Sequence, residues 1–129
     1  MPVPVVALYG SFNAFLNIGL ALYVSRLRTT HKVSLGTGDS REVLYAVRMH
    51  GNSAEFVPLA IVMLLIAELS GGAPMFLHVL GASLSIGRVL HIIGIPKKAP
   101  NPYRVLGNAA TWVMIMAASG YCLFLAARF

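Results

Sequence analysis

The chain has 129 residues, of which 57% are hydrophobic and only 11% are charged, and its formal net charge is +6. So few charged side chains cannot cover a water-soluble domain of this size, and the composition therefore predicts an integral membrane protein. The basic residues are scattered in short connectors between apolar runs, which favours anionic headgroups and an anionic ligand over nucleic acid as partners. The one cysteine, Cys122, excludes an intrachain disulfide and is expected to be a packed, unreactive thiol.

The first apolar run predicts a membrane-spanning helix over about residues 5–25, because it follows Pro2 and Pro4 and is closed by Arg26 and Arg28. Residues 29–38 are expected to form the connector to the next helix. The run lacks the basic start and the small-residue cleavage site of a secretory signal, so we expect it to be retained as a span.

The second helix is expected over about residues 40–69. Asp39 precedes Glu42 by three positions, a capping-box pattern that places the start of the helix near Ser40. Pro58 lies inside this helix and removes one backbone hydrogen bond, so we expect a bend there.

The third and fourth helices are expected over about residues 74–93 and 103–127. A short uncharged turn, Ser70-Gly-Gly-Ala-Pro74, precedes the third helix, and a proline-rich segment with two lysines precedes the fourth. The sequence thus predicts an all-α protein, a single four-transmembrane-helix bundle over residues 1–129.

The lysines and arginines concentrate in the first and third connectors, which lie on the same side of a four-span protein. By the positive-inside rule that side is cytoplasmic, and both termini lie on the opposite side. Glu68, near the opposite side, is expected simply to reach water. The basic residues expected near the cytoplasmic half are Arg26, Arg28, Arg48, Lys97, Lys98 and Arg104.

Three polar residues of the second helix share one face, since a helix turns by about 100° per residue and Asn52 and Glu55 then lie near the direction of Arg48. An unpaired charge at the bilayer centre costs on the order of 3 kcal/mol. Arg48 and Glu55 are two turns apart, so Asn52, another helix or a ligand must bridge them. This face is therefore either a ligand site or a purely structural set of interhelical hydrogen bonds.

Basic residues on the third and fourth helices are further candidates for a ligand site. Arg88 and His91 are three residues apart on the third helix and are therefore neighbours on one face. Arg104 lies in the first turn of the fourth helix, where a cation gains nothing from the helix dipole, so it faces either an anion or the lipid phosphates. No HExxH motif or cysteine pair is present, and we expect no metal site.

These residues resemble the signature motifs of a known membrane family. Arg48-x-x-x-Asn52-x-x-Glu55-Phe56-x-Pro58 resembles the second-helix signature of the membrane-associated proteins in eicosanoid and glutathione metabolism (the MAPEG family), which includes microsomal glutathione transferases.

Two later motifs extend the resemblance over nearly the whole chain. Arg88-Val-Leu-His91 resembles the third-helix motif of that family, and Lys98-Ala-Pro100 followed by Arg104 resembles the start of its fourth helix. Four spans and this chain length agree with the same family.

The resemblance implies a homotrimer that binds glutathione as co-substrate between neighbouring subunits on the cytosolic side. It implies a transferase or peroxidase in which Arg104 stabilises the glutathione thiolate for attack on a lipophilic second substrate that arrives from the bilayer. Glu55 would bind the glutathione ammonium and the arginines its carboxylates. The implied glutathione-binding residues are Arg26, Arg28, Arg48, Asn52, Glu55, Arg88 and His91.

The sequence also departs from some relatives. Tyr45 and Ile95 stand where some carry an arginine and a tyrosine, and Val105 stands where a thiol-donating serine is found in others. Two alternatives follow: a non-enzymatic lipid- or ligand-binding member of the same architecture, and a small proton-coupled exporter that uses Glu55 as its intramembrane acid.

Overall fold

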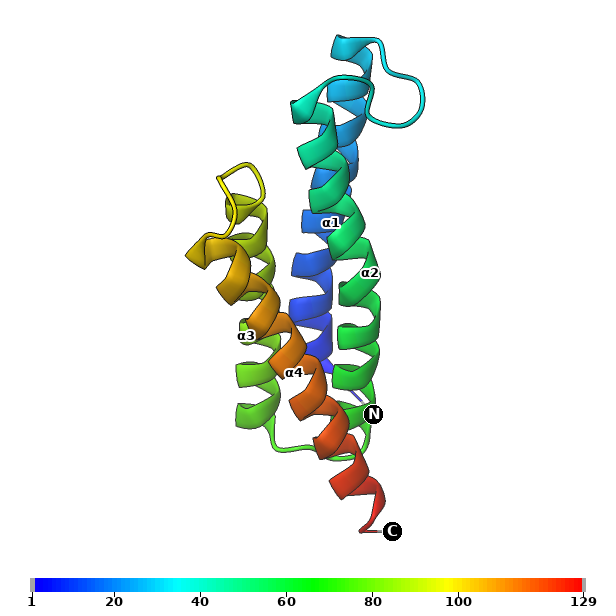
Figure 1. The fold of residues 1–129 in the computed structure, drawn as a ribbon. Coiled ribbons are helices and arrows are strands. Elements are labelled where there is room, and N and C mark those ends of the chain that lie inside the picture. The colour runs from blue at the N-terminus through cyan, green and yellow to red at the C-terminus, as the bar shows by residue number, and fades with distance from the viewer. Residues whose placement is uncertain (1, 129) are drawn as a thin grey trace.

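The computed structural model describes residues 2–128, and this part of the chain folds into four helices without strands. These are α1 (Pro4–His31), α2 (Arg41–Leu69), α3 (Pro74–Gly94) and α4 (Pro102–Ala126), which run alternately up and down (Figure 1). Each helix is long and apolar enough to cross a membrane. The predicted all-α, four-helix membrane bundle is confirmed.

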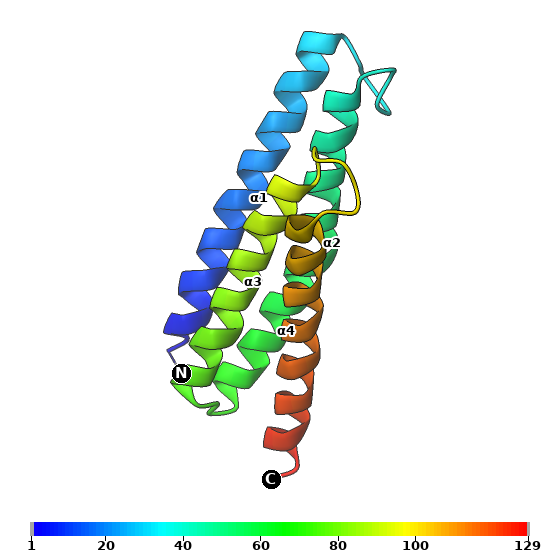
Figure 2. The ribbon, with the colours of Figure 1, turned by 60° about the vertical axis from the view of Figure 1, so that its left-hand side comes forward.

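The two ends of the bundle differ in what they carry. The connectors 32–40 and 95–101 lie at one end, here called the connector end (Figure 2). The turn 70–73 and both chain termini lie at the other, here called the terminal end. The basic connectors therefore share one end, as the sequence predicts.

One helix boundary differs clearly from that expected. α1 continues to His31 instead of ending near residue 25, because Thr29 and Thr30 donate their hydroxyls to carbonyls one turn earlier and do not interrupt the helix. α2 begins near Ser40 as expected, but Ser40 and not Asp39 is the N-cap, and its hydroxyl accepts a hydrogen bond from the Val43 backbone N–H. α2 runs continuously through Pro58.

The helices pack mainly as two hairpins, α1 with α2 and α3 with α4. α2 also contacts both α3 and α4, and α1 contacts α3, but α1 and α4 do not touch within the described residues. The α1–α2 hairpin projects beyond α3 and α4 at the connector end (Figure 1). Its tip therefore extends past the connector 95–101.

The terminal end holds most of the apolar core. Leucines from α2 and α3, including Leu64, Leu77 and Leu84, pack there with Met114 of α4 and are almost completely buried. Cys122 is buried in this cluster too, and its thiol donates to the Met63 carbonyl. The prediction of a packed cysteine is confirmed.

Glu68 does not simply reach water, as the sequence suggested. Its two carboxylate oxygens accept hydrogen bonds from the Val5 and Val6 backbone N–H groups at 2.9 and 2.7 Å. These N–H groups belong to the first turn of α1, where no intrahelical partner exists and where the helix dipole favours an anion. The end of α2 thus caps the start of α1.

Close contact between α3 and α4 depends on glycine. A Cβ atom at Gly107 would lie 2.5 Å from the His91 backbone nitrogen, and one at Gly94 would lie 2.5 Å from that of Arg104. Small residues allow such close approach between membrane helices. This packing places Arg104 directly against the end of α3.

Candidate functional site

Arg88 is the most buried cation of the structure, with 1% of its surface exposed. Its Nε and Nη2 donate to the Thr111 hydroxyl at 3.0 and 2.6 Å, and Nη2 also donates to the Gly107 carbonyl. Its Nη1 donates to Asn52 Oδ1 at 2.6 Å. The guanidinium group of α3 therefore ties α2 to α4.

All of these acceptors are neutral. Within residues 2–128 the one ion pair joins His31 and Glu42, at 3.0 Å, at the tip of the α1–α2 hairpin. No carboxylate of the described chain balances the charge of Arg88. A buried unbalanced charge is costly, and its burial favours an anion nearby.

His91 lies one helical turn from Arg88 and is also buried, with 3% of its surface exposed. Neither of its ring nitrogens has a hydrogen-bond partner within residues 2–128. The close contacts at Gly94 and Gly107 place Arg104 against the same end of α3. Arg88, His91 and Arg104 therefore lie in one region of the bundle, whereas Arg48 is exposed on α2.

The polar face of α2 divides into two parts. Asn52 points inward and accepts from Arg88, which matches the interhelical hydrogen bonding expected of a structural role. Arg48 and Glu55 are exposed, and neither side chain makes a hydrogen bond to the described chain. Both therefore face the outside of the single bundle, within a helix that spans the membrane.

Arg104 is half-buried at the start of α4. Its backbone N–H donates to the Asn101 side chain, which caps the helix, whereas its guanidinium makes no hydrogen bond to the described residues. It lines a surface cavity of about 470 Å³. The other lining residues are Ala99, Pro100, Asn101, Val105 and Asn108.

Arg48, Glu55 and Arg88 do not line the cavity beside Arg104. Arg28 lines another cavity at the tip of the α1–α2 hairpin, and Arg26 is exposed on α1. One chain thus places Arg88, His91, Asn52 and Arg104 near one another and leaves the remaining expected site residues apart.

Sequence reasoning missed the acceptors of Arg88 on α4. Gly107 and Thr111 are four residues apart, so they lie on one face, and Thr111 also donates to the Gly107 carbonyl. A hydroxyl and a glycine at this spacing are typical of a close membrane-helix contact. This four-residue spacing could have indicated, from the sequence alone, that this face of the fourth helix packs against another helix. Residues 2–128 contain no cluster of three metal-ligating side chains.

Four apolar helices and an intramembrane cationic cluster define a multi-pass membrane protein that gathers positive charge toward one end of its bundle. Comparison with known families is specific. The profile of the MAPEG family matches residues 6–124, and the chain belongs to that family.

Two curated relatives are similar over most of their length. The inner membrane protein YecN of Escherichia coli strain K12 is 35% identical over 112 residues, which cover 87% of this chain and 85% of YecN. YecN of Escherichia coli O6:H1 strain CFT073 matches with the same identity and coverage.

Proposed function

We propose that this protein is a glutathione-dependent transferase or peroxidase of the inner membrane. It binds glutathione at a site that faces the cytoplasm and stabilises the thiolate for attack on lipophilic electrophiles or hydroperoxides. The observation that carries the proposal is the buried Arg88 guanidinium with only neutral acceptors, in a bundle where Arg48 and Arg104 also have no carboxylate partner among the described residues. A small peptide anion balances this charge.

Each part of glutathione has a matching group. The two carboxylates suit guanidinium groups, which bind carboxylates in a bidentate way, and Arg48 is free to do so. The ammonium suits Glu55, whose exposed side chain has no partner among the described residues. Arg104, with its free guanidinium, takes the thiolate. The thiol proton passes to solvent, and the thiolate then adds to the electrophile or displaces a leaving group that departs as an anion. With a hydroperoxide, the thiolate breaks the O–O bond and releases the alcohol, and a second glutathione then forms the disulfide and releases water.

The site requires more than one copy of the chain. Arg48 and Glu55 lie on the outer face of a spanning helix, where lipid would leave both charges unsatisfied. A second copy packed against α2 covers this face and supplies the other wall of the site. We propose the homotrimer that the family resemblance implies.

Thiolate absorbance of bound glutathione tests the proposal. The purified protein in detergent is mixed with glutathione, and the ultraviolet thiolate band is compared for wild type, Arg104→Ala and Glu55→Gln. Removal of one group that stabilises an anion typically lowers a rate by 10²–10³-fold, about 3–4 kcal/mol. Arg104→Ala should therefore lose the thiolate band more than it loses binding, and Glu55→Gln should lose binding.

Lys98→Ala is the matched control. Lys98 is exposed in the connector that precedes α4 and does not line the Arg104 cavity. It should keep both binding and the thiolate band. An equal thiolate loss in Lys98→Ala would mean that general positive charge, and not Arg104, ionises the thiol.

A non-enzymatic ligand-binding role is the second candidate, and one observation favours it. Ile95 is buried with Leu20 and Met49, and Tyr45 packs against the same three residues. The position where some relatives carry a tyrosine is thus filled by an apolar contact. Glutathione binding without any thiolate band would favour this candidate over the enzyme.

A further inference from the structure

A groove lies between α1 and α3, which run side by side in the half of the bundle near the terminal end (Figure 2). Its volume is about 190 Å³, and it is lined by Leu8, Tyr9, Phe12 and Ser85. Leu8 and Phe12 are 57% and 46% exposed. The groove therefore opens toward the hydrocarbon of the bilayer.

Tyr9 forms a fixed wall of this groove. A Cβ atom at Gly81 of α3 would overlap with the Tyr9 ring, so the glycine allows the ring to lie directly against this helix. The Tyr9 hydroxyl lies 3.2 Å from His78 Nδ1, and the two rings meet edge to face. Phe12 is three residues after Tyr9 and is its neighbour on the helix surface. The groove thus presents aromatic surface that α3 holds in place.

Ser85 supplies the polar floor of the groove and is 8% exposed. Its hydroxyl oxygen accepts a hydrogen bond from Asn13 Nδ2 at 3.0 Å, and the same nitrogen donates to the Tyr9 carbonyl. A serine hydroxyl in a helix often donates to the carbonyl one turn earlier, but the Ser85 hydroxyl donates to no acceptor within residues 2–128. Its O–H group is therefore a shielded donor that is available to an oxygen of a ligand.

This donor lies near the centre of the bilayer. α3 has 21 residues, which at about 1.5 Å per residue match a hydrocarbon thickness of about 30 Å, and Ser85 stands at the middle of the helix. A phospholipid keeps its headgroup and ester oxygens at the interface, roughly 15 Å away. Its acyl chains offer no acceptor at this depth. The acceptor must therefore belong to a lipid-soluble molecule that has no headgroup.

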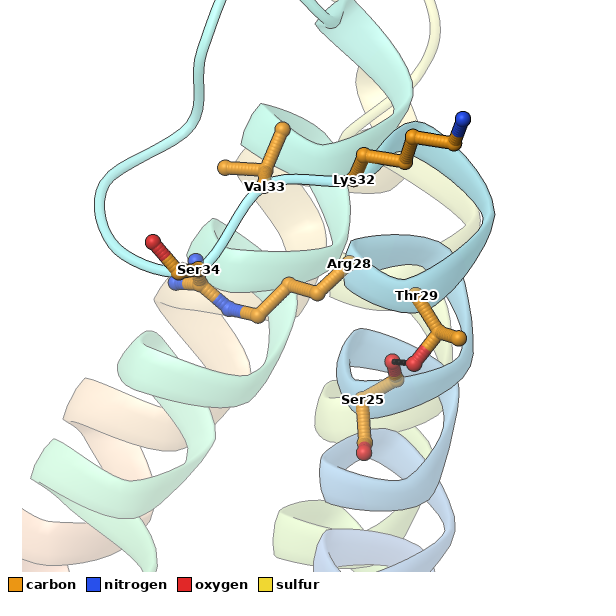
Figure 3. Close-up of a pocket in the computed structure, with 6 residues that line it drawn as sticks. All are labelled: Ser25, Arg28, Thr29, Lys32, Val33 and Ser34. Atoms are coloured by element: carbon orange, nitrogen blue, oxygen red, sulfur yellow. Dashed lines mark hydrogen bonds between the residues drawn. The ribbon is translucent and has the colours of Figure 1, made fainter.

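The groove also selects against charge and against size. No charged side chain lines it, whereas Arg28 and Lys32 line the cavity at the tip of the α1–α2 hairpin (Figure 3). An anion would therefore find no counter-charge in the groove. Its volume is below the range of about 300–1,000 Å³ that is usual for a whole small ligand. The groove fits one uncharged ring and leaves the rest of the ligand among the acyl chains.

We propose that the groove binds the ring of a lipid-soluble quinone. The flat ring stacks on Tyr9 and Phe12, the Ser85 hydroxyl donates to one ring carbonyl, and the hydrocarbon tail passes Leu8 into the bilayer. A quinone suits this depth because it is uncharged and no headgroup holds it at the interface. The site shares no lining residue with the Arg104 cavity and does not depend on glutathione.

Infrared spectroscopy of a labelled quinone tests the proposal. Decylubiquinone with carbon-13 at its ring carbonyls is added to the protein in phosphatidylcholine nanodiscs, and the carbonyl band is compared with that in nanodiscs without protein. A hydrogen-bonded carbonyl absorbs at lower wavenumber, so wild type should add a shifted band that saturates at one quinone per chain. Ser85→Ala should remove the shifted band and weaken binding by about two- to tenfold, as the loss of one hydrogen bond does.

Phe12→Ala tests the aromatic wall and does not depend on whether Ser85→Ala folds. It should leave the shifted band at the same wavenumber and weaken binding by about two- to tenfold, because one stacking contact is lost. Phe15→Ala is its control, since Phe15 is exposed on the same helix and does not line the groove. That variant should bind as wild type does.

Ser83→Ala is the matched control for Ser85→Ala. Ser83 lies on the same helix, donates to the Ala110 carbonyl of α4 and does not line the groove. It should keep the shifted band and the affinity of wild type. Far-UV circular dichroism should be the same for the two serine variants.

Three results would overturn the proposal. One is a wild type that shows no shifted carbonyl band. Another is a folded Ser85→Ala that keeps the band, or an equal loss in Ser83→Ala and Ser85→Ala. The third is displacement of the quinone by an equal amount of decylbenzene, which has a ring and a tail but no carbonyl. Such displacement would mean that the groove accepts any apolar chain.

Discussion

The two ends of the bundle differ in how well their apolar side chains are packed and their polar groups are paired. At the terminal end, leucines from α2 and α3 fill the core, and Glu68 satisfies the first turn of α1. At the connector end, the buried apolar cluster is small and is formed by Leu20, Met49 and Ile95. Polar atoms of Arg28, His91 and Asn108 are shielded from solvent there and have no hydrogen-bond partner among the described residues. The terminal end therefore contributes more of the packing that stabilises the fold, and the connector end has more polar groups that are available to bind a ligand.

The strongest test of this contrast removes core leucines from each end. Leu64→Ala at the terminal end should destabilise the fold by about 2–5 kcal/mol, the range for a cavity in a well-packed core. Leu20→Ala, in the smaller cluster of the connector end, should cost clearly less. Reversible unfolding in mixed micelles measures both. Equal costs would remove the contrast between the ends.

A smaller effect is expected where α3 and α4 touch. Gly107→Ala places a Cβ atom 2.5 Å from the His91 backbone and should cost about 1–3 kcal/mol, because backbone atoms must move apart. Gly120→Ala on the same helix is the control, since nothing lies within 4 Å of its Cβ position. That control should be neutral or stabilise by up to about 1 kcal/mol in the same unfolding assay.

Capping of α1 by Glu68 should be worth less again. Glu68→Ala leaves the Val5 and Val6 N–H groups without acceptors and should cost about 1 kcal/mol, as the loss of a helix cap does. Hydrogen exchange should speed up in the first turn of α1 and not in α3. Unchanged exchange at Val5 and Val6 would show that the carboxylate does not hold this end together.

The smallest effect should come from the tip of the α1–α2 hairpin. His31 and Glu42 form an ion pair whose side chains are 33% and 68% exposed. Exposed pairs contribute between 0 and about 1 kcal/mol, so Glu42→Gln should change the unfolding free energy by less than that amount. A larger loss would mean that the hairpin tip stabilises the whole bundle.

The fold was predictable because the apolar runs of the sequence and the proline and glycine residues between them indicate the same helices. Four apolar runs of span length, broken by proline and glycine, placed every helix end except that of α1 to within a few residues. The end of α1 was missed because Arg26 and Arg28 mark the limit of the hydrocarbon and not the limit of the helix. A helix continues into water where its residues allow it.

The site was predictable in its residue types and less so in its contacts. The spacing of Arg48, Asn52 and Glu55 predicts a shared face, but only the packing of α2 against α3 decides that Asn52 turns inward to Arg88. Acceptors on another helix, such as Thr111, follow from tertiary contacts and not from local pattern. The role of Glu68 was missed for the same reason, since its partners lie at the start of α1.

Equilibrium dialysis of reduced glutathione against the purified wild-type protein tests the central claim most directly. The account predicts saturable binding that is lost in Arg48→Gln and kept in the exposed control Arg41→Gln. Absence of saturable binding in the wild type, or equal loss in both variants, would contradict a glutathione site built on the intramembrane arginines.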